Sequence, residues 1–461
     1  MEMLQLILTF LIVGILIEGN GDKEKEHFNN AIKYYNEGNY KKAEKECRRA
    51  IKINPNNAES HHLLGKILFE TKRYDEAEKE FKEAIRIEPD YAEAHYNLGY
   101  LLEILERYDE AEKEYREAIR INPDFSSAYN RLADLLYKLG KGEEAANVRS
   151  EFSVHLFREE IRRNPNNVEA HIGLAISLQC LKRYDEAERE FREAIRINPN
   201  NADAYHLLGI LLTDLQRYDE AEKELREAIR INPNDAELHY SLGRLFAILQ
   251  KYDEAEKEYR EAIKIDPNYK VARKELIHLL YGLGRYEEAK EEYKEILRID
   301  PNDYYAHNAL GELLFREFKQ YEEAEKEFKE ALKINPLNTI ALYNLGSLLM
   351  ELERYKEAVE VYKALIKITP DDPIYHNFLA YCFEKLGQYE EAINEYKEIM
   401  RINPDDAETY LKLGDLYIKL GKKDKAKEEI LKAKELYEKL GDHEGVNHCK
   451  EILNSLGIKP K

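Results

Sequence analysis

The sequence predicts an all-helical protein in which one small helical hairpin is repeated many times. Three observations lead to this prediction: a proline that returns at a nearly constant interval, a fixed motif around it, and a composition rich in helix-forming residues. The interval is 34 residues in eight of ten cases, 35 once and 42 once, between Pro55, Pro89, Pro123, Pro165, Pro199, Pro233, Pro267, Pro301, Pro336, Pro370 and Pro404. A period of this length is typical of a supersecondary unit stacked in tandem, not of a compact enzyme domain.

The first helix of each copy is predicted from an apolar stripe that follows the proline. In the copy after Pro89 the stripe has the spacing i, i+3, i+4, i+7 of one helical face. It comprises His95, Leu98, Gly99 and Leu102. A polar residue just after the proline, with an acid three positions later, predicts a capping box. Such pairs are Asn56/Glu59, Asp90/Glu93, Asn166/Glu169, Asn234/Glu237 and Asp405/Glu408.

A second helix is predicted after a short break, and it ends at the next proline. In the same copy its buried positions are Ala111, Tyr115 and Ala118. Small residues such as Gly99 and Ala118 would let two antiparallel helices approach closely, while the large residues fill the gaps beside them.

These residues resemble the tetratricopeptide repeat. The matching positions are Leu98-Gly99, Ala111, Tyr115, Ala118 and Pro123, and Leu208-Gly209, Ala221, Leu225, Ala228 and Pro233 in a later copy. The resemblance covers residues 22 to about 442, or twelve copies. It implies an all-α, right-handed superhelical solenoid of helix-turn-helix repeats, with a concave groove lined by the first helices. The family's opening Trp or Tyr is often His here, at His27, His61, His95, His171, His239, His307 and His376.

Departures from the period suggest the domain organisation. The fourth copy reaches its proline after 42 residues, about two helical turns late, so its second helix is expected to be longer and the stacking to change there. We therefore expect repeats one to four over residues 22–165 and repeats five to twelve over 166–442. An amphipathic helix and tail over 443–461 would cap the last repeat.

The first residues, 1–21, do not follow the pattern. The segment Leu4–Ile17 is apolar apart from Gln5 and Thr9. A helix of this length is roughly 21 Å long, shorter than the ~30 Å hydrocarbon core of a bilayer, and no Lys or Arg precedes it as in a signal peptide. Three interpretations stay open: a short membrane anchor through residues 3–17, a signal segment, or a helix buried by a partner. The expected location is cytoplasmic or membrane-associated.

Composition and motifs argue against catalysis and nucleic-acid binding. The formal net charge is −20, whereas a nucleic-acid-binding protein needs a basic face. The sequence contains no phosphate loop, dinucleotide fingerprint, serine elbow or HExxH motif. The seven repeated histidines are one repeat apart, so they are expected in the core of successive hairpins and not around one metal ion. No enzyme activity, cofactor or metal is predicted.

Function is expected on the flank of the first helices, which the resemblance places in the groove. The second, fifth and ninth positions of these helices share one face. The second position is acidic in early copies, at Glu59, Glu93, Glu169, Asp203 and Glu237, and apolar later, at Val271, Tyr305, Ile340 and Ile374. Beside the apolar residues stand Lys274, Asn308, Tyr343, Asn344 and Asn377, with His278 and Tyr381 at the ninth position.

Apolar side chains with interleaved amides suit an extended peptide. The alternative is that these residues only pack on the preceding hairpin. The predicted function is a non-enzymatic scaffold that binds a protein or peptide segment in the groove, with a membrane tether as an option. The other candidate is a regulatory or assembly subunit of an enzyme whose catalytic site lies on another chain. Replacing Asn308 and Asn377 by Ala is expected to weaken binding without lowering the melting temperature.

Overall fold

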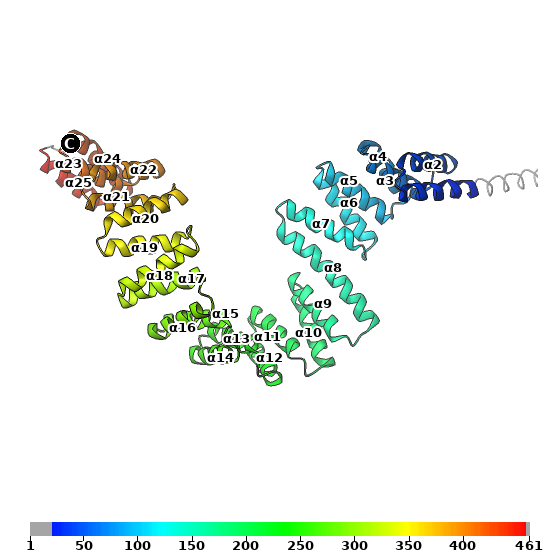
Figure 1. The fold of residues 1–461 in the computed structure, drawn as a ribbon, viewed down its shortest axis with the longest axis horizontal. Coiled ribbons are helices and arrows are strands. Elements are labelled where there is room, and N and C mark those ends of the chain that lie inside the picture. Colours follow the sequence, from blue (N-terminus) through cyan, green and yellow to red (C-terminus); the bar gives the residue numbers. More distant parts are fainter. Residues whose placement is uncertain (1–20, 458–461) are drawn as a thin grey trace, which may run out of the picture. The chain divides into compact units, whose positions relative to one another are not determined.

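A computed structural model describes residues 21–457 of the chain, and within this range the backbone is helical with short turns and no strand. Residues 21–36 form the first described helix, and the following helices pair in sequence order (Figure 1). The predicted stack of about twelve hairpins is therefore confirmed.

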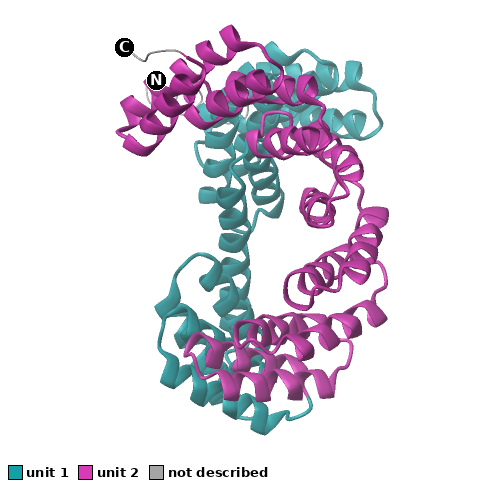
Figure 2. Cartoon of the chain, turned by 90° about the vertical axis from the view of Figure 1, so that its left-hand side faces the viewer, with its two compact units in different colours: residues 1–234 teal, residues 235–461 magenta. Residues whose placement is uncertain are grey.

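The chain divides into two compact units, residues 1–234 and 235–461 (Figure 2). In the first unit, the first helices of the hairpins after residues 21–36 are α3 (Ala58–Glu70), α5 (Ala92–Ile104), α7 (Ser126–Lys138), α9 (Val168–Cys180) and α11 (Ala202–Asp214). The second helices are α2 (Tyr40–Ile53), α4 (Tyr74–Ile87), α6 (Tyr108–Ile121), α8 (Gly142–Arg163), α10 (Tyr184–Ile197) and α12 (Tyr218–Ile231).

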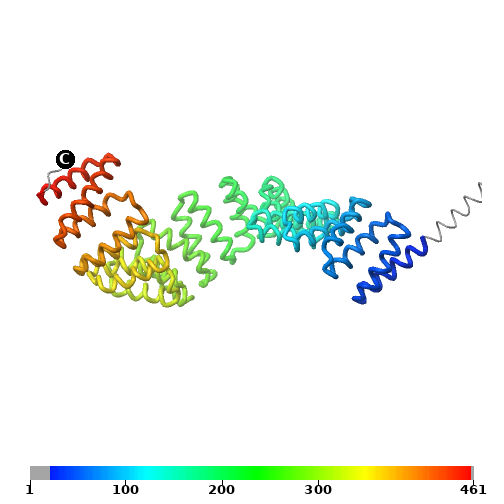
Figure 3. Tube along the Cα trace, turned by 90° about the horizontal axis from the view of Figure 1, so that it is seen from above, coloured from blue at the N-terminus to red at the C-terminus, as the bar shows by residue number. Residues whose placement is uncertain are grey.

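In the second unit the hairpins again follow one another in sequence order (Figure 3). The first helices are α13 (Ala236–Ile248), α15 (Lys270–Gly282), α17 (Tyr304–Leu313) with η1 (Leu314–Phe318), α19 (Thr339–Glu351), α21 (Pro373–Lys385) and α23 (Ala407–Lys419). The second helices are α14 (Tyr252–Ile265), α16 (Tyr286–Ile299), α18 (Tyr321–Ile334), α20 (Tyr355–Ile368), α22 (Tyr389–Ile402) and α24 (Lys423–Leu440). The closing helix α25 (His443–Ser455) packs on α24 and buries Val446, Cys449 and Leu453, as predicted for a cap.

In several hairpins a glycine of the first helix lies directly against an aromatic ring of the second helix. A methyl group added at Gly99 would lie 3.0 Å from Cδ1 of Tyr115 and 3.3 Å from the carbonyl oxygen of Ala111. At Gly243 it would lie 2.7 Å from Cδ1 of Tyr259. Both rings are buried. The ring therefore fills the space that a side chain on the first helix would need.

Both irregular intervals of the sequence have a local structural counterpart. α8 has 22 residues, whereas α6 has 14, and its extension places Phe157 against Gly173 of α9. The single interval of 35 residues contains the π-helical segment η1, which ends at Lys319 in the left-handed region. A π-turn takes up one extra residue without breaking the helix. The predicted division after residue 165 lies inside the first unit and stays a prediction.

The predicted capping boxes are wrong by one position. The N-cap of α3 is Asn57, whose side chain accepts a hydrogen bond from the Ser60 amide at 2.8 Å. The cause is the preceding turn, where the side chain of Asn54 accepts from the amide of Asn56 at 3.2 Å. That turn uses one more residue, so each helix starts one residue later than predicted. α5 follows the same pattern, with Tyr91 as an N-cap that makes no side-chain capping bond.

Arginine ion pairs join the turn of one hairpin to the second helix of the hairpin before it. The Arg107 guanidinium donates to Glu78 at 2.8 Å and also holds Glu110 at the start of its own helix. Equivalent pairs are Arg73–Glu44, Arg217–Glu188, Arg285–Glu256 and Arg354–Glu325. Partly exposed pairs contribute only ~0.2–1 kcal/mol each, so they support the stack but do not determine it.

The apolar segment 3–17 lies outside the described residues, and its predicted role stays a prediction. Among residues 21–457, none of the helices combines the length and the apolar character needed to cross a bilayer.

We predict that Gly243→Ala destabilises the second unit by about 1–3 kcal/mol, because its new methyl group would displace the buried ring of Tyr259. Gly282→Ala, at the end of α15, is the matched control, since nothing lies within 4 Å of a methyl group there. Denaturant unfolding of both variants measures the difference. Equal stabilities for the two variants would contradict this packing.

Candidate functional site

Four large apolar side chains occupy the second position of successive first helices in the second unit. They are Val271 of α15, Tyr305 of α17, Ile340 of α19 and Ile374 of α21, and we call them the apolar row. Their exposed fractions are 48%, 50%, 59% and 55%. At the same position the first unit exposes charged residues, namely Glu59, Glu93, Glu169 and Asp203. Side chains that are half exposed gain little from packing on a neighbouring hairpin, so the row is a surface and not a core.

Two of the predicted amides lie inside the fold. Asn308 of α17 and Asn344 of α19 are 6% and 4% exposed, and the Asn344 amide nitrogen donates to the Asn308 side-chain oxygen at 3.1 Å. The two side chains thus form a hydrogen bond between the first helices of successive hairpins. The expectation that Asn308 contributes to binding without affecting stability is corrected, because a buried, paired amide is part of the packing.

The remaining predicted residues surround the row. Lys274 lies 3.6 Å from the Asp303 carboxylate and 5.3 Å from the centre of the Tyr305 ring. His278 is exposed on α15. Tyr343 packs against Phe378 in a tilted arrangement, with ring centres 5.8 Å apart and ring planes at 56°.

Tyr381 of α21 is 43% exposed. Its ring centre is 6.3 Å from that of Tyr355, and the Lys385 ammonium group lies 5.2 Å from it. A half-exposed tyrosine held in this way presents a fixed aromatic surface to solvent.

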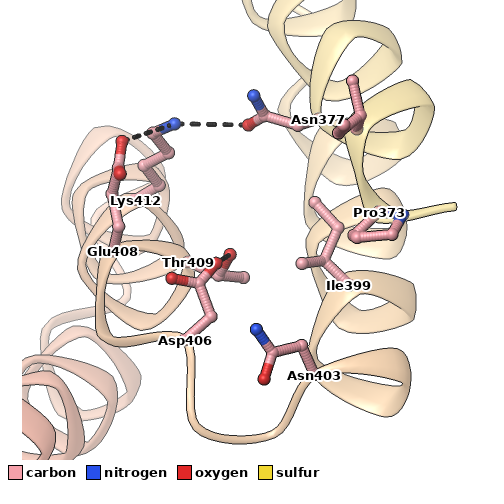
Figure 4. A pocket seen from close by; sticks show the side chains of 9 residues that line it. Pro373, Asn377, Ile399, Asn403, Asp406, Glu408, Thr409 and Lys412 are labelled. Carbon is pink, nitrogen blue, oxygen red and sulfur yellow. Dashed lines mark hydrogen bonds and ion pairs between the residues drawn. The ribbon is translucent and has the colours of Figure 1, made fainter. Parts of the chain in front are cut away.

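A pocket lies at the α21 end of the apolar row, between α21, α22 and α23 (Figure 4). Its lining residues are Pro373, Ile374, Asn377, Ile399, Asn403, Asp406, Glu408, Thr409 and Lys412. Across its opening, the Lys412 ammonium group donates to the Asn377 side-chain oxygen at 3.2 Å and lies 2.9 Å from the Glu408 carboxylate. The pocket thus combines an apolar wall with an amide and a charged pair.

A second pocket adjoins the first, because Asn377 and Lys412 line both. Its other lining residues are Ser347, Met350, Glu351, Phe378, Tyr381, Glu384 and Tyr396. The Tyr396 hydroxyl donates to Glu384 at 2.7 Å. Burial and this carboxylate raise the pKa of Tyr396 far above its usual value, so the tyrosine stays neutral. Together the two pockets form a depression across α19, α21 and α23.

Sequence reasoning located the apolar row and Asn377 but missed Lys412, Phe378 and Met350. Lys412 and Phe378 occupy the sixth position of their helices, which the second, fifth and ninth pattern leaves out. The same position in α19 is the buried Asn344. In the structure the sixth position of α23 reaches α21, because Lys412 donates to Asn377. Within residues 21–457, no three His, Cys, Asp or Glu side chains come together as a metal site would require.

We predict that Asn344→Ala lowers the free energy of unfolding by about 1–3 kcal/mol, because it leaves the buried Asn308 amide without its partner. Asn377→Ala is the control, since its partly exposed amide bonds to a surface lysine, and a change within ~0.5 kcal/mol is expected. Chemical denaturation of both variants makes the comparison. A neutral Asn344→Ala would contradict the assignment of this amide to the core.

Models of the tetratricopeptide repeat match nearly all of the described chain. The matched residues are 28–92, 64–124, 104–148, 153–202, 178–245, 248–313, 315–382, 383–421 and 407–440. No curated protein matches the sequence.

Several solved structures resemble the chain at low sequence identity. Naa15, in a complex of Naa15 and Naa10 bound to HypK-THB, is 16% identical over 94% of this chain and 77% of its own, with a TM-score of 0.47. Yeast Tom70 is 16% identical over 87% and 96%, with a TM-score of 0.34. YrrB, described as a TPR protein with an unusual peptide-binding site, is 23% identical over 41% and 96%, with a TM-score of 0.33.

Proposed function

Because the chain belongs to the tetratricopeptide repeat family, we propose that it is a non-enzymatic scaffold that binds an extended segment of another protein. The proposed binding surface is the apolar row of the second unit together with the depression across α19, α21 and α23. The observation that carries this proposal is the row itself: four large apolar side chains, each about half exposed, on successive first helices of a highly charged chain.

The row supports an apolar segment because such exposed side chains gain free energy when they leave water. Full burial of an Ile side chain is worth about 1.5–3 kcal/mol relative to exposure. The four residues recur once per hairpin, so a segment that runs along the first helices would meet one apolar contact for each repeat that it crosses.

The polar side chains of the depression favour a ligand with an extended peptide backbone. A peptide in this conformation exposes its amide and carbonyl groups to the surface, and these need polar partners when they are desolvated. Asn377, Lys412 and Glu408 lie at the opening of the pocket and carry donors and acceptors of that kind. Tyr381, at the ninth position, adds an aromatic face beside them.

The partner segment is therefore expected to be rich in Ile, Leu, Val or aromatic residues and to carry no run of acidic residues. Acidic side chains would be repelled by a chain whose formal net charge is −20. A basic segment without apolar residues would leave the row exposed.

A peptide library displayed on phage and selected against the full chain tests the proposal. We predict that the selected peptides lose at least tenfold in affinity for the double variant Ile340→Glu, Ile374→Glu, because two apolar contacts are removed and each 1.4 kcal/mol is a factor of ten. Since both side chains are exposed, the unfolding midpoint is expected to change little.

The matched control is Leu337→Glu, which replaces a 69% exposed leucine in the turn before α19, outside the row. This variant is expected to keep the wild-type affinity. Peptides that bind the double variant as well as they bind the wild type would place the binding surface elsewhere.

A further inference from the structure

One position of the first helices, two residues after the position of the apolar row, repeats the same polar contacts along the chain. A histidine stands there in seven copies, and in each of them Nδ1 lies 2.6 Å from a glutamate of the second helix. At five of these histidines Nε2 lies 3.0–3.1 Å from the carbonyl oxygen of the proline before the hairpin. The sets are His61 with Glu80 and Pro55, His95 with Glu114 and Pro89, His171 with Glu190 and Pro165, His307 with Glu327 and Pro301, and His376 with Glu395 and Pro370. We call each set a histidine clamp.

Both partners of the histidine are hydrogen-bond acceptors. A neutral imidazole carries one N–H group, so one of its nitrogens would direct a lone pair at an oxygen, whereas the imidazolium ion donates from both nitrogens. The glutamates have side-chain exposures of 17–28% in these five sets. The geometry therefore fits a protonated, positively charged histidine.

The eighth copy provides an internal comparison, because Arg273 replaces the histidine. Its guanidinium group donates to the Glu292 carboxylate and, at 3.2 Å, to the carbonyl oxygen of Pro267. These are the same two acceptors as in the histidine copies. Arginine has no acceptor atom and is always charged in proteins. A permanent cation therefore fits the position that histidine occupies elsewhere.

The other charged groups around a clamp also favour the cation. In addition to Glu80, His61 faces Glu83 of α4, which is bound to Arg86. The Cys47 thiol of α2 lies near Glu80. Burial and the charge of Glu80 raise the pKa of this thiol to about 12, so the thiol stays neutral.

His95 faces Glu114 and Glu117 of α6, and His376 faces Glu395 and Glu398 of α22. Glu117 and Glu398 are bound to Arg120 and Arg401, respectively.

These surroundings raise the pKa of three of the histidines. For His61 the hydrogen bond with Glu80 is the main cause, and for His376 it is the bond with Glu395. For His95, burial would lower the pKa, but the bonds with Glu114 and the Pro89 carbonyl together outweigh it.

We propose that the histidine clamps are a repeated pH-sensitive device that holds the start of each first helix against its second helix while protonated and weakens when the proton is lost. In the second unit the clamps of His307 and His376 lie two residues after Tyr305 and Ile374, so they fix the helix ends that carry the apolar row.

The sign of the pH effect follows from the raised pKa values. A group whose pKa is higher in the folded state stabilises it fully below its unfolded value, about 6.5 for His, and this contribution falls as the pH rises through the folded value. His62 behaves oppositely, because burial lowers its pKa to about 4, and its effect is confined to lower pH. The buried thiols come into play only above about pH 8. The interval from pH 6.5 to 8.0 therefore reports on the clamps.

The first test is NMR of the full chain with isotope-labelled histidine. At pH 7.0 we expect the ring nitrogens of His61, His95 and His376 to have imidazolium chemical shifts. Assignment uses single His→Gln variants. Neutral-ring shifts for all three clamp histidines at pH 6.5 would overturn the proposal.

The second test compares two triple variants at positions 61, 95 and 376, one with Arg and one with Gln. The unfolding midpoint of the wild type is expected to fall between pH 6.5 and 8.0. The Arg variant should show a smaller fall, because its charge does not titrate, and the Gln variant should be less stable than wild type at pH 6.5 with an equally small fall. His278→Gln is the control and should keep the wild-type fall. The clamp would be contradicted if the unfolding midpoint of the Arg variant fell as far as that of the wild type, or if the wild-type midpoint did not fall. If the Gln variant does not fold, the comparison of the Arg variant with the wild type is sufficient.

Discussion

The close contact between a glycine of the first helix and a buried ring of the second is the constraint on which the rest of the structure depends. It fixes how near the two helices of a hairpin lie and which faces they turn to each other, as at Gly99 and Tyr115. Contacts of this kind recur in α3, α5, α13, α17 and α19, and in α11 and α23 the glycine faces Leu225 and Ile430 instead of a ring. In these hairpins each first helix therefore turns the same position toward its second helix. A residue type that recurs once per repeat, as in the apolar row, then forms a continuous surface, although each repeat contacts only its neighbours.

Much of the repeat structure could be predicted from the sequence, because the copies within one chain can be aligned with one another. The proline interval and the small residues Gly99 and Ala118 beside large ones were enough to predict the hairpin, and the change from acid to apolar residues at the second position indicated the row. The direct contact of Gly99 with the Tyr115 ring is a finding of the structure. The capping residues were misplaced by one because the turn before each first helix uses one more residue than predicted. This turn contains the Asn54 side-chain bond before α3 and a backbone bond from the Tyr91 amide to the Glu88 carbonyl before α5. The burial of Asn308 and Asn344 was missed because periodicity gives the face of a helix but not its distance from the next first helix.

Polar groups have two separate roles in this stack. Most charges form local pairs on the helix surface, and even the arginine pairs between hairpins, such as Arg107 with Glu78, are partly exposed and individually weak. The histidine clamps differ, because they are largely buried and use both ring nitrogens against acceptors. Histidine at this position also departs from the family pattern: an aromatic ring could fill the space, whereas a side chain with two donors can bond to both the glutamate and the proline carbonyl, as Arg273 does.

The central claim is that the first helices of the second unit bind an extended apolar segment of another protein. Hydrogen exchange of the full chain, with and without a saturating selected peptide, tests this claim most directly. We expect slower exchange at the starts of α17, α19, α21 and α23, with the second helices α18, α20 and α22 nearly unchanged. Protection confined to those second helices, or to the first unit, would contradict it.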